Sequence, residues 1–160
     1  MSTYTGYLLR VNLSSGHIER EPVKPELTAD FIGGRGFGIS YLYNELAPGR
    51  DPLGEENKLI FLPGVLAGTR AQGFGRWIVM TKSPLTGGLA RSVGGGNFAA
   101  WMKFAGCDLI IVEGKAEVPS YIFLTGDTAE IRPADDLWGM DTAQTQKALE
   151  ERVGKRVQTA

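Results

Sequence analysis

Four short, continuous runs of apolar residues are the feature that most constrains how this chain can fold. The runs cover residues 59–62, 77–80, 109–112 and 121–124, and glycine, proline or charged residues bound them. A buried helix needs ten or more residues, so runs of this length indicate strands that are buried on both faces.

Two β-hairpins are predicted around turn residues. Apolar and other residues alternate over residues 6–13, and Ser14-Ser15-Gly16 then supplies a turn before residues 17–21, which predicts a hairpin with one buried face. Gly126-Asp127 lies between residues 121–125 and 129–132 and predicts the second hairpin. Residues 155–159 are expected to begin another strand.

Four helices are predicted from their periodicity and their end signals. Pro25 starts a short one, in which Leu27 and Phe31 share a face and Gly33 is the C-terminal cap. The fourth spans residues 142–153. Each of the two helices between them has an apolar stripe that we assign to the core. The first stripe is Ile39, Leu42, Tyr43 and Leu46, and the second, after an Asn97 cap, is Phe98, Trp101, Met102 and Ala105.

These elements predict an α+β fold, β-rich with several short helices, because strands outnumber long helices and no internal repeat is present. Residues 1–160 are expected to form a single domain. The last predicted strand has no neighbour at Ala160, so this domain is expected to be an incomplete part of something longer.

A block of positive charge lies in the middle of the chain. Residues 57–107 contain no Asp or Glu, whereas the remainder has 11 Lys plus Arg and 18 Asp plus Glu. The cations of the block are Lys58, Arg70, Arg76, Lys82, Arg91 and Lys103. Glycine is frequent here and lets backbone N–H groups approach an anion, so the block predicts an anion-binding site. The alternative is a set of unrelated surface cations.

Several classes of function are excluded or disfavoured. Cys107 is the only cysteine, so cysteines form neither a disulfide nor a metal cluster within the chain. Low cysteine usage is typical of reducing compartments, so the protein is expected to be cytoplasmic. The only histidine, His17, lies at a predicted turn, and we identify no catalytic group. A pI of 5.9 disfavours nucleic-acid binding. No apolar run is long enough to cross a membrane.

The run from Gly94 to Ala99 matches a loose form of the dinucleotide-binding fingerprint, with a predicted strand ending at Glu113 downstream. Residues 89–93 make a poor buried strand, however, and further strand–helix units are missing. A phosphate-bearing ligand held by glycine backbone and arginine is favoured instead. Arg76 is the most specific candidate side chain, because its forked donors suit an anionic partner.

A series of short motifs extends over residues 4–138. The motifs are Thr5-Gly6, Arg10-Val11-Asn12-Leu13, Gly33-Gly34-Arg35-Gly36, Asp51-Pro52-Leu53, Gly75-Arg76, Thr81-Lys82-Ser83-Pro84-Leu85-Thr86-Gly87, Gly95-Gly96 and Lys103-Phe104-Ala105-Gly106. Their arrangement resembles the N-terminal domain of the aldehyde:ferredoxin oxidoreductases, a family of tungsten-pterin enzymes.

The resemblance implies that this domain is a base for a tungsten (or molybdenum) bis-pterin cofactor with Mg between its phosphates. Arg76 is then expected between a pterin and the iron–sulfur cluster, and Val93 is expected to offer its backbone carbonyl to Mg. Gly94, Gly95 and Gly96 would lie against the cofactor, with Gly95 allowing close approach. The family commonly has Asn and Ser where this chain has Val93 and Gly94. A carbonyl ligand survives that change, whereas a side-chain contact does not.

The resemblance further implies a parent enzyme that oxidises aldehydes to carboxylic acids with ferredoxin as electron acceptor, although relatives act on other substrates. The domains that bind the cluster lie beyond a point matching Ala160, so this chain alone is expected to be inactive. Two alternatives stay open: a stand-alone anion- or nucleotide-binding module, and a structural subunit.

Overall fold

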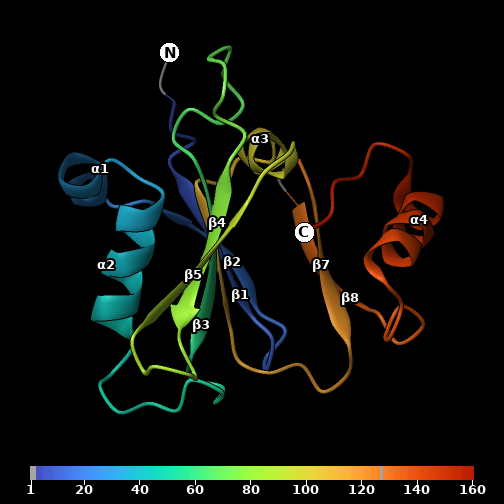
Figure 1. Cartoon of the computed structure of the whole chain (residues 1–160), viewed down its shortest axis with the longest axis horizontal. Coiled ribbons are helices and arrows are strands. Elements are labelled where there is room, and N and C mark those ends of the chain that lie inside the picture. The colour runs from blue at the N-terminus through green and yellow to red at the C-terminus, as the bar shows by residue number, and fades with distance from the viewer. Residues whose placement is uncertain (1–2, 127) are drawn as a thin grey trace.

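The computed structural model describes residues 3–126 and 128–160, which form eight strands and four helices (Figure 1). In chain order they are β1 Tyr7–Asn12, β2 Ile18–Pro22, α1 Pro25–Phe31, α2 Arg35–Glu45, β3 Lys58–Pro63, β4 Trp77–Lys82, β5 Leu89–Gly94, α3 Phe98–Phe104, β6 Leu109–Glu113, β7 Ser120–Thr125, β8 Thr128–Pro133 and α4 Thr142–Val153.

The centre of the molecule is a six-stranded mixed sheet in the order β2-β1-β6-β3-β4-β5. Only the β1–β6 pair is parallel, and the other neighbours in this sheet are antiparallel. β7 and β8 form a separate two-stranded ribbon. The predicted α+β class and both predicted hairpins are confirmed, although Asp127 of the second turn lies outside the described residues.

Both faces of the central sheet are covered. Helices α1 and α2 lie on one side, and α3 with the β7–β8 ribbon lies on the other, with α4 beyond the ribbon (Figure 1). Strand β6 is central, so its residues 109–112 are all buried and alternate between the two hydrophobic clusters. The other three apolar runs are only partly buried. β3 is as central as β6, but Leu59 in its run is exposed, whereas β4 lies next to the edge strand and β7 belongs to the ribbon.

The prediction that the first hairpin buries one face is wrong. Leu8 packs into the cluster beneath α2, whereas Leu9 and Val11 pack into the cluster beneath the ribbon. Strand β1 lies between β2 and β6 inside the sheet, so layers on both sides remove its side chains from water.

The predicted core stripe of α2 is also wrong in part. Leu42 is buried, but Ile39 is exposed and Tyr43 has 85% of its surface exposed. The helix instead turns Gly38 toward the sheet, where an added Cβ would lie 2.6 Å from the Met80 sulfur. This close approach fixes the rotation of α2 and brings Phe37 and Tyr41 into the core.

The ends of two predicted elements differ from expectation. α1 has its C-terminal cap at Ile32, in an unusual conformation with φ 61°, rather than at Gly33. The Tyr4 hydroxyl donates to the Ile32 carbonyl and holds this turn. α4 has the predicted bounds, but residues 155–159 form no strand. The Thr159 hydroxyl there donates to Gln146 at 2.9 Å and returns the chain to α4.

Candidate functional site

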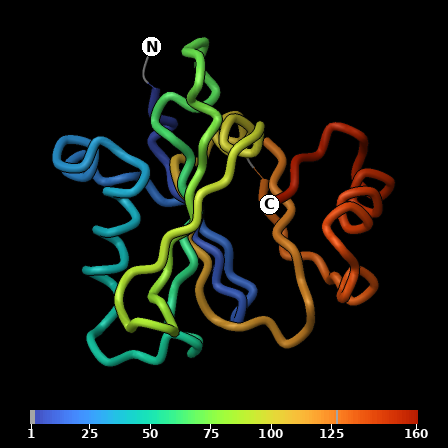
Figure 2. The backbone as a smooth tube through the Cα atoms, in the orientation of Figure 1, coloured from blue at the N-terminus to red at the C-terminus, as the bar shows by residue number. Residues whose placement is uncertain are grey.

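The structure brings the predicted site residues together at one end of the β4–β5 pair. Trp77 lies opposite Gly94, and Ile78 lies opposite Val93. Just before β4, a Cβ added to Gly75 would lie 3.0 Å from the Gly96 carbonyl oxygen. The loop that precedes β4 and the glycine run that follows β5 therefore meet beside the start of α3 (Figure 2).

The backbone of Arg76 is fixed, whereas its side chain is exposed. The Gly64 N–H donates to the Arg76 carbonyl at 3.0 Å, which extends the β3–β4 ladder by one residue. The guanidinium makes no ion pair or hydrogen bond with the residues that the structure describes. The chain thus presents a permanently charged, forked donor from a rigid strand end.

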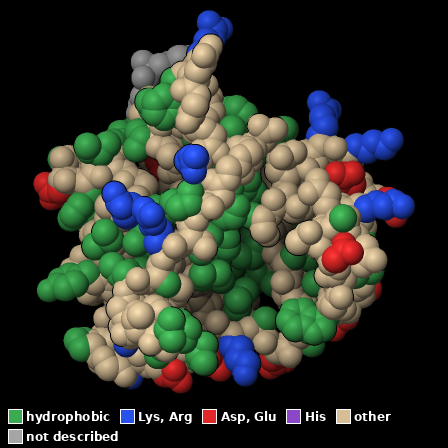
Figure 3. Space-filling model, viewed as in Figure 1, with side chains coloured by type: hydrophobic (Ala, Val, Ile, Leu, Met, Phe, Trp, Pro, Cys, Tyr) green, Lys and Arg blue, Asp and Glu red, His purple; other side chains and the backbone are tan. Residues whose placement is uncertain are grey.

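The predicted block of six cations divides into two groups. Lys58 and Lys103 form ion pairs inside the fold, and Lys82 donates to the Arg50 carbonyl at 2.5 Å. Arg70, Arg76 and Arg91 are exposed and have no ion-pair partner among residues 3–126 and 128–160. Lys and Arg side chains are seen over β4, β5 and the loop above them, while most acidic side chains lie toward the margins (Figure 3). The predicted anion site is therefore narrower than the whole block.

The three glycines of the run have different physical roles. An added Cβ at Gly94 would lie 2.4 Å from the Trp77 ring, so Gly94 is required by packing within the protein. At Gly95 and Gly96 an added Cβ would meet nothing within 4 Å, so this backbone faces open space. Gly96 has φ 88°, a conformation that favours glycine.

A shallow hollow of about 260 Å³ lies beside the glycine run. Its lining is glycine-rich and comes from two loops and α3: Leu66, Gly68, Thr69, Ala71, Gly73, Phe74, Gly75, Gly96, Asn97, Ala100 and Phe104. Neither Gly95 nor Gly96 donates a backbone hydrogen bond to another loop or turn within the described chain. Exposed backbone donors, small residues and a nearby arginine fit a phosphate-bearing ligand.

Val93 lies on the edge strand, with 45% of its surface exposed. Alternate residues of an edge strand direct their carbonyl groups away from the sheet, where a cation or a partner can reach them. The exposed position is compatible with a carbonyl ligand at Val93. Among the described residues, no group of three or more His, Cys, Asp or Glu side chains is placed to hold a metal ion.

The dinucleotide-binding alternative does not fit the fold. The run from Gly94 to Ala99 joins β5 to α3 and then β6, but β3 and β4 separate β5 from β6 in the sheet. The pairings β6–β3, β3–β4 and β4–β5 are all antiparallel, so β5 and β6 run in opposite directions. Glu113, the acidic residue at the end of the downstream strand, is occupied elsewhere by Lys58.

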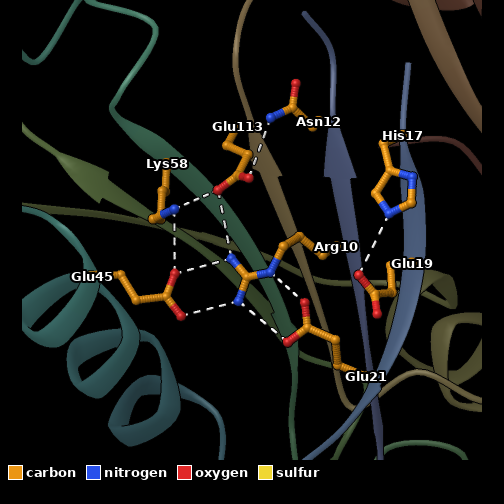
Figure 4. A network of polar contacts seen from close by, with 8 residues as sticks. All are labelled: Arg10, Asn12, His17, Glu19, Glu21, Glu45, Lys58 and Glu113. Atoms are coloured by element: carbon orange, nitrogen blue, oxygen red, sulfur yellow. Dashed lines mark hydrogen bonds and ion pairs between the residues drawn. The ribbon is translucent and has the colours of Figure 1, made fainter. Parts of the chain in front are cut away.

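An ion-pair network that sequence reasoning missed contains Glu113 (Figure 4). Arg10 on β1 contacts Glu21 at 2.5 Å, Glu45 at 3.0 Å and Glu113 at 3.5 Å. Lys58 contacts Glu45 at 3.3 Å and also pairs with Glu113. These residues come from β1, β2, α2, β3 and β6, so no local spacing could have indicated the network. It fixes α2 to the sheet.

The network changes the acidity of its members. Burial opposes the charge of Glu113, but the hydrogen bond and charge of Lys58, with Arg10 and Asn12, lower its pKa below the ordinary value. Burial also opposes the charge of Arg10, and its bonds to Glu45 and Glu21 outweigh this and raise its pKa. Burial, with the charges of Glu45 and Glu21, raises the pKa of Tyr41 to about 12.

The only cysteine and the only histidine of the chain differ in their exposure to solvent. Cys107 is fully buried in the second hydrophobic cluster, as a structural residue would be. His17 is exposed at the hairpin and lies 3.5 Å from Glu19 (Figure 4). In the described part of the chain, every helix is too short or too polar to cross a bilayer.

Comparison with known proteins gives consistent matches along the chain. Residues 8–160 match the family described as aldehyde ferredoxin oxidoreductase, N-terminal domain. The chain is 50% identical over 161 residues to a tungsten-containing aldehyde ferredoxin oxidoreductase of Pyrococcus horikoshii, covering 100% of this chain and 26% of that protein. It is 38% identical over 160 residues to an aliphatic sulfonate oxidoreductase, WOR-like subunit, of Pyrococcus furiosus, covering 98% and 25%.

A solved structure has the same fold. A chain in the active site complex BamBC of benzoyl coenzyme A reductase, in complex with 1,5-dienoyl-CoA, matches with a TM-score of 0.93 at 38% identity. The match covers 95% of this chain and 23% of that one. The chain therefore spans about a quarter of the length of the relatives that it matches.

Proposed function

This chain belongs to the family of the N-terminal domain of aldehyde ferredoxin oxidoreductase, and from that premise we propose that it is the cofactor-binding base of a larger bis-pterin oxidoreductase. The metal would be tungsten, with molybdenum as the alternative, and Mg would be bound together with the cofactor. The names of the relatives support tungsten. The remaining domains of the enzyme supply the iron–sulfur cluster, and this chain alone is inactive.

The observation that supports this role most strongly is the state of Arg76. Its backbone is held by Gly64, and its neighbour Gly75 lies against Gly96, but its own charge is unpaired within the described residues. An arginine presented in this way beside open glycine backbone is suited to an anionic ligand. We assign Arg76, Gly95 and Gly96 to direct contact with the cofactor, and Gly94 to the shape of the run.

When bound, the cofactor supplies the metal centre for a two-electron oxidation. The part of this chain is to bind and orient it. The Arg76 guanidinium donates hydrogen bonds to an anionic group, and the Gly95 and Gly96 N–H groups do so from the loop. Val93 offers its backbone carbonyl to Mg from the edge strand. A site on a strand end and a short loop holds its donors more rigidly than a long loop does.

The parent enzyme, in this proposal, oxidises aldehydes to carboxylic acids in the cytoplasm and passes the electrons to ferredoxin. Two relatives named as ferredoxin oxidoreductases support the electron acceptor. The relative named as an aliphatic sulfonate oxidoreductase indicates that substrates vary among proteins with this domain. The pocket for the substrate is therefore assigned to the remaining domains.

The test uses the complete enzyme with Arg76→Ala and, as a matched control, Arg91→Ala, since both arginines are exposed and belong to the same acid-free block. We expect Arg76→Ala to lower the tungsten or molybdenum content per enzyme at least about tenfold, as loss of a charged hydrogen-bonding group implies. Arg91→Ala should retain the metal. Elemental analysis of purified enzyme measures both. Unchanged metal content in Arg76→Ala would remove Arg76 from the site, and a wild-type enzyme with neither metal would end the proposal.

A further inference from the structure

We propose that Trp77 is a positioning residue that holds the glycine run 94–96 in the shape that receives the cofactor. This inference rests on the proposed function, because the ligand of the run is the cofactor assigned above. It concerns a side chain that makes no contact with the ligand and acts through Gly94 and Gly95.

The indole of Trp77 contacts the glycine run at two points. Its ring covers Gly94, the residue directly opposite it in the β4–β5 pair, so closely that an added Cβ would lie 2.4 to 2.6 Å from three ring atoms. Its ring N–H donates to the Gly95 carbonyl at 3.2 Å. The first contact excludes any side chain at position 94, and the second fixes the orientation of the next peptide group.

The indole itself is held from both sides. It stacks on Phe61 of β3 with ring centroids 6.3 Å apart, and its centroid lies 4.9 Å from that of Phe98, the first residue of α3. Aromatic contacts of this kind restrict the ring to one orientation. Trp77 therefore transmits the position of the central sheet to the glycine run and to the start of α3.

The need for such a support follows from the run itself. Three consecutive glycines have more conformational freedom than any other three residues, and ordering them costs correspondingly more. Gly95 and Gly96 have open space where a side chain would be, so no packing of their own restricts them. The indole N–H on the Gly95 carbonyl supplies that restriction and leaves the outer side of the run accessible.

Trp77 directly follows Arg76, so one end of β4 carries both the charged donor and the support for the glycine run. Side chains alternate between the two faces of an extended strand, so Trp77 and Arg76 are directed to opposite faces. Arg76 immediately precedes β4, and the same alternation puts its side chain on the face that carries Ile78 and Val93. These two residues are opposite each other in register. The charged donor and the support for the glycine run are thus fixed by consecutive residues.

The test again uses the complete enzyme. Trp77→Phe keeps an aromatic ring between Phe61 and Phe98 but removes the donor to Gly95. Gly94→Ala retains the indole but displaces it from its position. Two controls match these changes. Phe61→Leu alters the same aromatic cluster without touching the run, and Gly88→Ala alters a glycine at the other end of β5, where a Cβ would meet only Thr86 at 3.6 Å.

Two readouts separate positioning from simple stability. We expect hydrogen exchange of the amides of residues 95–97 to increase about fivefold in Trp77→Phe, the change that corresponds to the loss of one neutral hydrogen bond. We also expect metal content to fall in Trp77→Phe and Gly94→Ala, to fall less in Phe61→Leu, which loosens the indole but leaves its donor to Gly95, and to stay at the wild-type level in Gly88→Ala.

Unchanged exchange, or unchanged metal content in Trp77→Phe, would overturn the positioning role. Metal loss that is equal in Phe61→Leu would overturn it as well, since it would be an effect of the cluster as a whole. A wild-type enzyme without metal is a different result, because it refutes the proposed function before any variant is compared. If Trp77→Phe does not fold, Gly94→Ala decides the question by the same two readouts.

Discussion

Lys103 and Asp108 form an ion pair that is almost entirely withdrawn from solvent, with 7% and 2% of their side-chain surfaces exposed. The Asp108 carboxylate also accepts hydrogen bonds from the N–H groups of Thr5 at 3.2 Å and Gly6 at 2.7 Å. The Lys103 ammonium donates to the Thr3 carbonyl at 3.2 Å. The pair therefore joins the end of α3 to the segment before β1, and Lys103 is not available to a ligand.

Asp108→Asn is expected to lower the free energy of unfolding by about 3–5 kcal/mol, because it leaves the buried charge of Lys103 without its partner. Urea unfolding monitored by circular dichroism measures this. Asp136→Asn is the matched control, since Asp136 pairs with Arg152 at the surface, where ion pairs contribute little. A loss no larger than that of the control would show that Asp108 does not stabilise the fold.

Glu113→Gln is expected to weaken the fold at neutral pH by about 1–2 kcal/mol, since it removes a charged acceptor from Lys58 and Arg10. The pKa of Glu113 is lowered in the folded state. Its contribution is therefore present above the ordinary pKa of a glutamate and is lost as the pH falls through the folded value.

The difference between wild type and Glu113→Gln should accordingly shrink as the pH falls below about 4.3, the unfolded value. Unfolding curves between neutral and acidic pH measure it. Glu56→Gln, which alters an exposed pair with Arg50, should change little at any pH. A difference for Glu113→Gln that stays constant with pH would contradict the assignment.

Tyr41→Phe is expected to change how the fold responds to alkaline pH. Burial and the charges of Glu45 and Glu21 raise the pKa of Tyr41 to about 12, above the unfolded value of about 10. A raised pKa gives stability that is fully present below the unfolded value and is lost as the pH rises through the folded one.

Between pH of about 10 and 12, wild type should thus lose stability faster than Tyr41→Phe, which has no group to ionise at this position. Urea unfolding at several alkaline pH values gives the slopes. Tyr43→Phe serves as the control, because Tyr43 has 85% of its surface exposed, and its slope should equal that of wild type. Equal slopes for wild type and Tyr41→Phe would refute the prediction.

Local signals in the sequence predicted most elements of the fold. The Pro25 start and the bounds of α4 were correct, because a proline at a first turn and a capping box act within a few residues of the helix end. The paired hairpins followed from turn residues in the same way. The rotation of α2 was not predictable, since Gly38 faces the sheet only because Met80 and Leu62 lie beneath it.

The sequence selected the members of the candidate site, but not the contacts that each of them makes in the fold. Arg76 and the run from Gly94 to Gly96 could be selected from charge and composition, and the fold does bring them together. The sequence contained no signal that Lys58 and Lys103 form ion pairs inside the fold, because their partners Glu113 and Asp108 lie outside the acid-free stretch. The sequence also gave no indication that the Trp77 ring packs on Gly94.

The sequence by itself determined most of the segments that are strands and helices, and where positive charge and glycine are concentrated, because propensity, periodicity and composition are properties of neighbouring residues. Only the tertiary structure decided which faces of β1 and α2 are buried, which cations remain exposed, and how Trp77 meets Gly94 across the sheet. Those outcomes depend on contacts between residues far apart in the chain, and strand order and register set these contacts.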